Sequence, residues 1–298
     1  MATLALVGAP SSAGAWWPGS EKAPAALRRA GLADALAPDV EVHDAGDVPT
    51  AVSRLTRAGR RHQNLDAVVA TAAAVADAVD AACARHGRCL VLGGDCTVTF
   101  GVVAGAARRW PSLGLVYVDG HTDLNTPDTT RTGIMDSMGA AHVVGRGTPE
   151  LLAVGPRRPL LPEERVVFYG YVPDELYDTE REWLESGSFV RVPFTDVDET
   201  AATAVRTAIE QRVDAYVLHF DVDVVEFVDF PIADVPNLYS GLTLDGALDA
   251  VRTLAASPKL AAITVTELNP DRDHAGTLVR AFAAKLANTL KACSIAWS

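Results

Sequence analysis

Two observations predict that this chain has an α/β fold built on a parallel β-sheet. Short runs rich in β-branched residues alternate with Ala-rich stretches of helical spacing from one end of the chain to the other. Most of the short runs are apolar throughout, which is typical of strands covered by helices on both faces of a sheet. The alternation shows no break in composition over 298 residues, so we expect a single domain spanning residues 1–298.

Eight segments qualify as strands of this sheet. In chain order they are Thr3–Gly8, Val40–Asp44, Arg88–Gly93, Leu113–Val118, Arg165–Tyr169, Phe189–Val192, Ala215–Phe220 and Ala261–Thr266. Between the strands, apolar side chains recur at helical spacing, as they do from Leu65 to Val79 and from Ala247 to Leu254. The Ala-rich stretch from Thr71 to Ala84 continues the first of these patterns, and we expect it to be a packed helix.

Composition excludes several classes of partner. Lys and Arg number 26 and Asp and Glu 38, which gives a net charge of −12 that is repelled by phosphate backbones and anionic membranes. We therefore expect neither a nucleic-acid nor a membrane partner. No apolar run reaches the roughly 20 residues that span a bilayer, and the first residues lack the features of a signal peptide. A cytoplasmic location is expected, where the four cysteines would remain thiols.

Residues of metal-ligand type follow three of the predicted strands. Gly93-Gly94-Asp95-Cys96 follows the third, Asp119-Gly-His121-Thr-Asp123 the fourth, and Asp221-Val-Asp223 the seventh. Open α/β sheets bind their ligands at the carboxyl ends of strands. Since residues two apart in an extended chain point the same way, each motif can direct its side chains to one point.

So many carboxylates in a half-buried pocket require a strong positive charge, because unpaired buried carboxylates would protonate. Two divalent cations would supply that charge. The alternative interpretation, an exposed acidic loop, fits Asp128 and Asp229 but not residues that directly follow buried strands.

Four motifs at strand ends, in this order, then indicate a family. They are Val91-Leu-Gly93-Gly94-Asp95-Cys96, Asp119-Gly-His-Thr-Asp-Leu-Asn-Thr-Pro127, His219-Phe-Asp221-Val-Asp223 and Glu267-Leu-Asn269-Pro270. With the loop from Gly8 to Gly14, they resemble the ureohydrolases, the superfamily of arginases and agmatinases, and the resemblance runs nearly end to end. It implies a three-layer αβα sandwich with an eight-stranded parallel sheet, the fold that arginases share with deacetylases.

The resemblance also implies a dinuclear manganese site that activates water for attack on a guanidinium carbon. Asp119 and Asp221 would bridge the two cations. The residues implied for the first cation are Cys96, Asp119, Asp123 and Asp221, and those for the second are Asp119, His121, Asp221 and Asp223. Asp123 would also take a proton from the water, and Glu267 would pair with the guanidinium through both carboxylate oxygens.

The loop after the fourth strand favours an α-amino acid as substrate. Asn125, Thr130 and Thr132 match the arginase residues that hold the α-carboxylate, with Thr132 in the place of a serine. Hydroxyl and amide donors bind a carboxylate without adding formal charge. Alternatively, these are turn residues that cap their own backbone.

Cys96 departs from the family, which has histidine at this position. A thiolate is soft and manganese prefers hard oxygen ligands, so this residue opens zinc, iron, cobalt or nickel as the native metal. The N-hydroxy-arginine hydrolases of cycloserine biosynthesis also have residues like Cys96 and Gly120 at these positions, so the sequence resembles that subgroup more than ordinary arginases. His219 stands where the family has serine, and it either supports the site from behind or packs within its strand.

Asp136 stands where arginases keep a histidine that shuttles protons. A carboxylate of pKa about 4 is a poor acid at neutral pH. Three explanations remain open: the acidic pocket raises the pKa of Asp136, His142 reaches in from the following helix, or the leaving group needs little help. His142 is otherwise a helix-packing residue. Tyr171, Phe227 and Phe230 are candidates for an apolar entrance.

We therefore expect a metal-dependent hydrolase of a linear guanidine or amidine. The expected substrate is arginine or N-hydroxy-arginine, giving ornithine with urea or hydroxyurea. One alternative is a non-catalytic metal-binding or regulatory relative, and another is a hydrolase of a different guanidino or formimino compound. Deacetylase-like amide hydrolysis is disfavoured by the Gly-Gly-Asp turn and by Glu267-Leu-Asn-Pro. The sequence leaves a homo-oligomer open.

Overall fold

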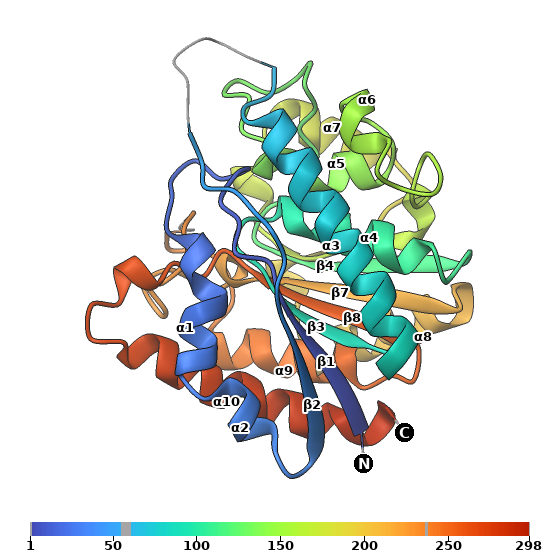
Figure 1. Cartoon of the computed structure of the whole chain (residues 1–298). Helices are drawn as coiled ribbons and strands as arrows, with labels where there is room; N and C mark the ends of the chain where they lie inside the picture. Colours follow the sequence, from blue (N-terminus) through green and yellow to red (C-terminus); the bar gives the residue numbers. More distant parts are fainter. Residues whose placement is uncertain (1, 55–60, 236–237, 298) are drawn as a thin grey trace.

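One sheet of eight parallel strands forms the centre of the computed structural model, which describes residues 2–54, 61–235 and 238–297. The strand order is β2-β1-β3-β8-β7-β4-β5-β6 (Figure 1). The strands are β1 (Ala2–Gly8), β2 (Val40–Asp47), β3 (Cys89–Leu92), β4 (Leu113–Val118), β5 (Val166–Tyr171), β6 (Val190–Pro193), β7 (Ala215–Asp221) and β8 (Leu260–Thr266). All eight predicted strands are present, with ends shifted by a few residues, so the predicted parallel sheet is confirmed.

Helices cover both faces of the sheet. One layer contains α1 (Ala23–Arg29), α2 (Leu32–Leu36), α8 (Glu199–Arg212), α9 (Leu244–Ala255) and α10 (Thr277–Ser294). The other contains α3 (Leu65–His86), α4 (Thr97–Ala107), α5 (Gly139–Val143), α6 (Pro149–Leu152) and α7 (Asp178–Ser186). Figure 1 shows α9 and α10 on one side of the sheet and α3 and α4 on the other. The expected three-layer αβα sandwich is therefore confirmed.

The strands are apolar throughout because each one contributes to two cores. In β1, Leu4 and Leu6 pack into the layer that contains α10, whereas Ala5 and Val7 pack into the layer that contains α3. Successive side chains of a strand point to opposite faces. A strand buried on both faces therefore loses the polar alternation that a half-exposed strand shows.

Within the described residues, α3 alone has the length and apolar composition that could cross a membrane. In the structure it packs beside α4 and β1, with Val68, Val75 and Val79 completely buried. A helix that covers a sheet needs such an apolar face, so these properties alone do not assign it to a membrane.

The four central strands, β3, β8, β7 and β4, place the functional motifs. They are neighbours in the sheet and all run the same way, so their carboxyl ends meet at one edge. Each of the four motifs recognised in the sequence follows one of these strands. The sheet thereby brings together residues that are up to about 170 positions apart, such as Cys96 and Thr266.

Candidate active site

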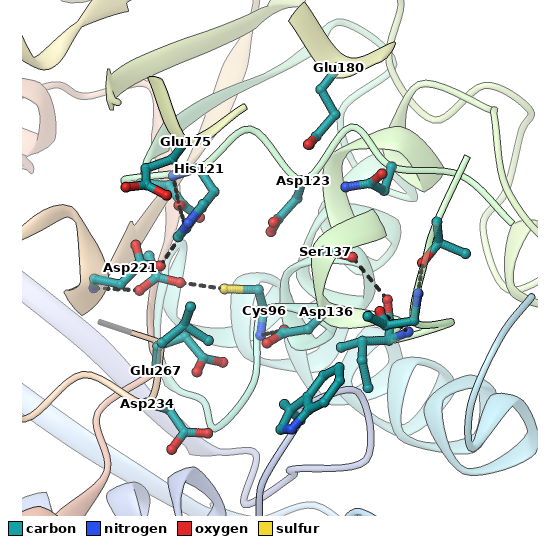
Figure 2. Close-up of a pocket in the computed structure, with 18 of the residues that line it drawn as sticks. Cys96, His121, Asp123, Asp136, Ser137, Glu175, Glu180, Asp221, Asp234 and Glu267 are labelled. Atoms are coloured by element: carbon teal, nitrogen blue, oxygen red, sulfur yellow. Dashed lines mark hydrogen bonds and ion pairs between the residues drawn. The ribbon is translucent and has the colours of Figure 1, made fainter. Parts of the chain in front are cut away.

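A cavity of about 510 Å³ opens at this edge of the sheet (Figure 2). All of the site residues proposed from the sequence line it: Cys96, Asp119, His121, Asp123, Asn125, Thr130, Thr132, Asp136, Asp221, Asp223 and Glu267. They come from four strand ends and from the loop after β4. The structure thus gathers the whole predicted set around one space.

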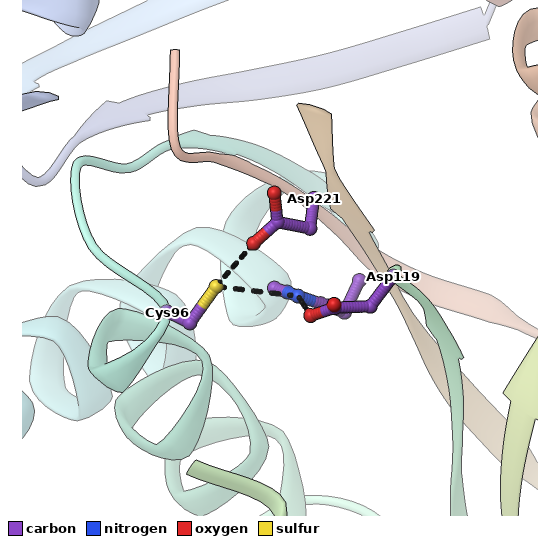
Figure 3. Close-up of side chains that lie close together, drawn as sticks. Cys96, Asp119 and Asp221 are labelled. Atoms are coloured by element: carbon purple, nitrogen blue, oxygen red, sulfur yellow. Dashed lines mark hydrogen bonds and ion pairs between the residues drawn. The ribbon is translucent and has the colours of Figure 1, made fainter. Parts of the chain in front are cut away.

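Four buried side chains form what we call the inner cluster: Cys96, Asp119, His219 and Asp221. The Cys96 Sγ lies 2.6 Å from Asp221 Oδ2 and 3.7 Å from His219 Nε2. His219 Nε2 is also 3.4 Å from Asp119 Oδ2. Figure 3 shows Cys96, Asp119 and Asp221 pointing toward one another. A thiol, an imidazole and two carboxylates on one point can coordinate a divalent cation.

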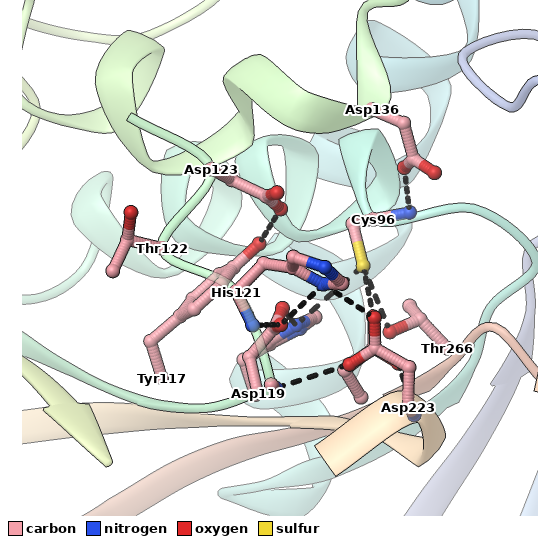
Figure 4. A network of polar contacts seen from close by, with 12 residues as sticks. Cys96, Tyr117, Asp119, His121, Thr122, Asp123, Asp136, Asp223 and Thr266 are labelled. Atoms are coloured by element: carbon pink, nitrogen blue, oxygen red, sulfur yellow. Dashed lines mark hydrogen bonds and ion pairs between the residues drawn. The ribbon is translucent and has the colours of Figure 1, made fainter. Parts of the chain in front are cut away.

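Asp119, His121 and Asp223 form the outer cluster, which is partly open to the cavity. His121 Nδ1 lies 2.8 Å from Asp223 Oδ2 and 3.9 Å from Asp119 Oδ1 (Figure 4). Asp119 belongs to both clusters. This is the arrangement that a carboxylate bridging two cations requires.

Backbone N–H groups orient the three acidic residues of these clusters. The N–H of His121 donates to Asp119 Oδ1 at 2.5 Å, and that of Asp223 donates to Asp221 Oδ1 at 2.6 Å. The Gly120 N–H donates to Asp223 Oδ1 at 3.1 Å. One oxygen of each carboxylate is therefore held by the chain, which fixes the direction of the side chain before any cation arrives.

Asp123 adopts a geometry that the extended-chain argument did not anticipate. The chain leaves the β conformation after Val118, and Asp123 has a left-handed backbone with φ of 48°. Its Oδ2 accepts a hydrogen bond of 2.5 Å from the buried Tyr117 hydroxyl. Asp123 thus lines the cavity but lies outside both clusters, and its role as a metal ligand stays a prediction.

Burial shapes the charge state of these residues. It raises the pKa of Asp119 and Asp221 well above the usual range, and neighbouring carboxylates add to the effect. It also raises the pKa of Asp123 to about 7 and lowers that of His219 to about 3. Burial opposes the charge of His121, but Asp223 outweighs it and raises the pKa to about 9.

This donor set fits divalent cations. Several buried carboxylates converge on the inner and outer clusters, and Cys96, Asp136 and Glu267 form a third close group beside them. Buried carboxylates carry negative charge at neutral pH only if a positive charge offsets it. Oxygen, nitrogen and sulfur donors are all present in the inner cluster, and oxygen and nitrogen donors in the outer one.

Asp95, which precedes Cys96 in the sequence motif, has a structural role. Its Oδ2 accepts hydrogen bonds from the Ser11 hydroxyl at 3.0 Å and the Gly14 N–H at 3.1 Å, and its Oδ1 accepts from Thr97. A Cβ at Gly94 would lie 1.7 Å from the Ser11 carbonyl oxygen, so only glycine fits this close approach. The turn therefore clamps the loop after β1 against the site.

Glu267 has a buried carboxylate that no hydrogen-bond donor among the described residues reaches, although it lies beside the Asp136 carboxyl. Its side chain is 1% exposed, and neither Oε1 nor Oε2 has a hydrogen-bond partner among the described residues. Its backbone is left-handed, with φ of 61°. Burial, followed by the charge of Asp136, raises the pKa of Glu267 well above its usual value. An unsatisfied buried carboxylate on strained backbone is costly, which points to a ligand that satisfies it.

Asp136 lies between Cys96 and Glu267 in the cavity wall. Its Oδ1 accepts a 2.6 Å hydrogen bond from the Cys96 N–H, and burial raises its pKa well above the usual range. His142, the alternative proton carrier, is turned away. Its ring nitrogens contact the Met138 carbonyl at 2.7 Å and the Thr148 N–H at 3.1 Å, and burial lowers its pKa to about 4. The helix-packing interpretation of His142 fits these contacts.

The hydroxyls of the loop after β4 cap their own backbone and face the cavity as well. Thr130 Oγ1 accepts from the N–H groups of Thr132 and Gly133, and Thr132 Oγ1 accepts from Ile134. A hydroxyl that accepts in this way still has a proton to donate. Asn125 is buried, with its Oδ1 3.4 Å from the Thr129 hydroxyl. Capping the backbone of the loop and binding an α-carboxylate are therefore compatible roles for these residues.

The entrance is built from residues that the sequence analysis missed. Trp16 and Trp17 line the cavity, together with Tyr177, whose ring lies 4.6 Å from the Arg131 guanidinium. The expectation of an entrance made by Tyr171, Phe227 and Phe230 is wrong. Tyr171 and Phe230 are buried in the two cores, and Phe227 packs under Arg272. An aromatic pair within a Gly- and Pro-rich loop was the available signal for Trp16 and Trp17.

Two further residues near the cavity, Tyr117 and Asp234, were missed. His219, whose role the sequence left open, belongs to the inner cluster. His219 and Tyr117 each lie two positions before an acidic residue, on β7 and β4, so strand alternation places them on the same face as Asp221 and Asp119. Asp234 lines the cavity, and its Oδ1 accepts from Asn269 at 2.6 Å, whereas its Oδ2 has no hydrogen-bond partner among the described residues. No motif marked Asp234, which lies in a long irregular loop.

Comparisons with known proteins agree with this geometry. A model described as the arginase family matches residues 2–292. The arginase of Bacillus caldovelox is 30% identical over 281 residues, which cover 92% of this chain and 93% of that protein. A crystal structure of arginase from Bacillus subtilis has a TM-score of 0.85 at 26% identity, covering 97% of this chain and 98% of that one.

A formimidoylglutamase structure from Bacillus subtilis has a TM-score of 0.78 at 18% identity, covering 99% of this chain and 88% of that one, and it shows a shared fold alone. The ureohydrolase resemblance predicted from four motifs is thus confirmed over nearly the whole chain. The chain belongs to the arginase family of hydrolases.

Proposed function

We propose that this protein hydrolyses the guanidino C–N bond of a small α-amino acid, arginine or N-hydroxy-arginine, in the cytoplasm. The observation that carries this proposal is the buried carboxylate of Glu267, which lines the cavity and receives no hydrogen bond from a donor among the described residues. A guanidinium is planar and presents paired N–H donors, which match the two oxygens of one carboxylate. Glu267 would hold the substrate by this fork.

The opposite end of the substrate would meet neutral donors. Asn125, Thr130 and Thr132 line the cavity with an amide and two hydroxyls, and Arg131 adds a positive charge beside them. These groups suit an α-carboxylate. Glu175 lines the same cavity and offers a negative charge for an α-amino group. A substrate that carries all three charged groups would therefore use more of the cavity than agmatine, which has no carboxylate.

Two divalent cations would sit in the two clusters. Asp119 would contact both, with Cys96 and Asp221 on the inner side and His121 and Asp223 on the outer side. Bound there, the cations supply a water of lowered pKa next to the substrate carbon. Manganese suits the outer cluster, whose donors are oxygen and nitrogen, whereas the Cys96 thiol leaves zinc, iron, cobalt or nickel open for the inner one.

Two acidic residues would handle protons. Asp123 has one oxygen fixed by the Tyr117 hydroxyl, and its other oxygen would accept a proton from the attacking water. Asp136 contacts the Cys96 N–H, and it would deliver a proton to the leaving amine. The reaction adds water to the guanidino carbon, breaks its bond to the amine nitrogen and releases urea with ornithine.

N-hydroxy-arginine is the second candidate, and it is favoured because Asp136, a poorer acid at neutral pH, stands where arginases keep a histidine that shuttles protons. An N-hydroxyguanidine is less basic than a guanidine, so the reaction needs less assistance from a strong proton donor. With that substrate the products would be hydroxyurea and ornithine.

A substrate panel tests the proposal. Metal-loaded protein would be assayed with arginine, N-hydroxy-arginine, agmatine and formiminoglutamate, with product amines measured by mass spectrometry. We expect turnover of arginine or N-hydroxy-arginine and at least roughly 10-fold lower kcat/KM for agmatine, which lacks the carboxylate contact. Preference for agmatine would contradict the assigned role of Asn125, Thr130 and Thr132.

A further inference from the structure

His219 is the buried histidine that the proposed mechanism leaves without a task. It lies on β7, two residues before Asp221, so both side chains project from the same face of the strand. It is completely buried, and its Nε2 faces the Cys96 thiol and the Asp119 carboxylate. The arginase motif has serine at this position, and it has its histidine where this chain has Cys96.

We propose that His219 is the nitrogen ligand of the inner cation, which it would bind together with Cys96, Asp119 and Asp221. The inner cluster would then be a site of one sulfur, one nitrogen and two oxygens that selects zinc over manganese. This inference rests on the proposed function only in assuming that the two clusters hold cations. Relative to the arginase motif, the nitrogen ligand of this cation would stand on β7 instead of at the start of α4.

The two distances from His219 Nε2 within the inner cluster are close to those of a tetrahedral site. Zinc binds nitrogen and oxygen at about 2.0 to 2.1 Å and sulfur at about 2.3 Å, so tetrahedral geometry separates its ligand atoms by roughly 3.3 to 3.6 Å. His219 Nε2 lies 3.4 Å from Asp119 Oδ2 and 3.7 Å from Cys96 Sγ. The 2.6 Å contact between Cys96 Sγ and Asp221 Oδ2 is a hydrogen bond that a cation would replace, opening it by about 1 Å.

The surroundings of His219 hold its ring in the orientation that a ligand needs. The Nδ1 atom lies 2.7 Å from the Thr99 hydroxyl on α4. A proton on Nδ1, donated to Thr99, leaves the Nε2 lone pair facing the cluster, and metal-binding histidines are oriented through their second nitrogen in this way. The Tyr117 ring stacks on the imidazole with centroids 4.0 Å apart and planes 19° apart. The side chain therefore has one accessible orientation.

The donor types decide the preferred metal. Thiolate and imidazole favour zinc, whereas manganese prefers carboxylate, carbonyl and water oxygens. The outer cluster contributes no sulfur, because its members are Asp119, His121 and Asp223. The protein would therefore hold two different metals when both are supplied, with zinc on the inner side.

The test measures metal binding directly. The full chain would be equilibrated with zinc and manganese together, its metal content measured by mass spectrometry, and its zinc environment measured by X-ray absorption. We expect one zinc with one sulfur and an imidazole among its ligands. His219→Ser, which introduces the family residue, should remove that imidazole signal and weaken zinc binding on the order of 100-fold or more, since loss of a supporting partner alone costs 10- to 100-fold.

Two further variants guard against a folding defect. Thr99→Val keeps the imidazole and removes only its Nδ1 partner, so it should retain the zinc spectrum while weakening zinc binding about 10-fold. His142→Ser removes another buried histidine, one held by Met138 and Thr148, and should leave zinc binding unchanged. Zinc binding that is weakened equally by His142→Ser would overturn the inference.

The outcome separates this inference from the proposed function. If His219→Ser keeps wild-type zinc affinity and an unchanged absorption spectrum, the inference is wrong whatever the activity. If zinc binds through sulfur and imidazole as expected but no guanidino compound is turned over, the inference stands and the proposed function fails.

Discussion

Replacing Glu267 with glutamine separates substrate recognition from metal binding. The variant keeps the shape of the side chain and removes its charge. No hydrogen-bond donor among the described residues reaches either carboxylate oxygen, so the substitution breaks no donor contact, and the amide can still lie beside the Asp136 carboxyl. A protonated carboxyl and an amide bury similar polarity, and we therefore expect an unchanged melting temperature and unchanged metal content.

The kinetic effect follows from the lost ion pair. A hydrogen bond to a charged group contributes about 1.5 to 3 kcal/mol. At about 1.4 kcal/mol for each factor of ten, Glu267→Gln should reduce kcat/KM roughly 10- to 150-fold. The assay is steady-state ornithine release by metal-loaded protein, with melting temperature and metal content measured on the same sample.

Glu163→Gln is the matched control. Glu163 lies away from the cavity and accepts hydrogen bonds from the Trp183 indole at 2.8 Å and the Ser188 N–H at 3.0 Å. It should lower stability slightly and leave kcat/KM unchanged. If Glu267→Gln keeps kcat/KM within about twofold of wild type, Glu267 does not pair with the substrate and the reasoning is refuted.

Three other predictions follow from the same geometry. Asp119→Asn should lower occupancy at both metal positions, because Asp119 belongs to both clusters; full occupancy by mass spectrometry would remove it as a bridge. Thr130→Val should raise KM for the α-amino acid substrate several-fold and leave the weak reaction of agmatine unchanged, and equal effects on both substrates would indicate a structural role alone. The rise in melting temperature on adding metal should grow between about pH 5.5 and about pH 8. The pKa values of Asp119 and Asp221 are raised, so the metal-free fold binds protons more tightly than the unfolded chain and loses stability as the pH rises above about 4. Bound cations displace those protons and remove this loss. A metal-induced shift in melting temperature that does not depend on pH would contradict the prediction.

The fold was predictable because its strands carry a strong local signal. A run such as Leu113–Val118 is apolar at every position, and burial on both faces requires that pattern. The acidic motifs could be placed because they directly follow such runs, and parallel strands bring their carboxyl ends together. Local sequence was sufficient for these features.

The remaining features depend on contacts between distant segments. His219 became a member of the inner cluster because β7 lies beside β4 and because Thr99 on α4 orients its ring. The left-handed backbone of Asp123 has no marker in the sequence, since most residues with positive φ are glycines. Trp17 reaches the cavity because the loop before it is held in place by the hydrogen bond from the Gly14 N–H to the Asp95 carboxylate, two residues 81 positions apart. Such pairings appear only when the sheet order is known.

The most direct test of the central claim follows the carbon atom of the reaction. Arginine and N-hydroxy-arginine labelled with ¹³C in the guanidino group would be incubated with metal-loaded protein, metal-free protein and the Asp221→Asn variant, and the label would be followed by NMR. The account predicts labelled urea or hydroxyurea from the metal-loaded wild-type protein and none from the other two samples. Loaded protein with both metals bound that leaves both compounds intact would contradict the account and favour a non-catalytic relative.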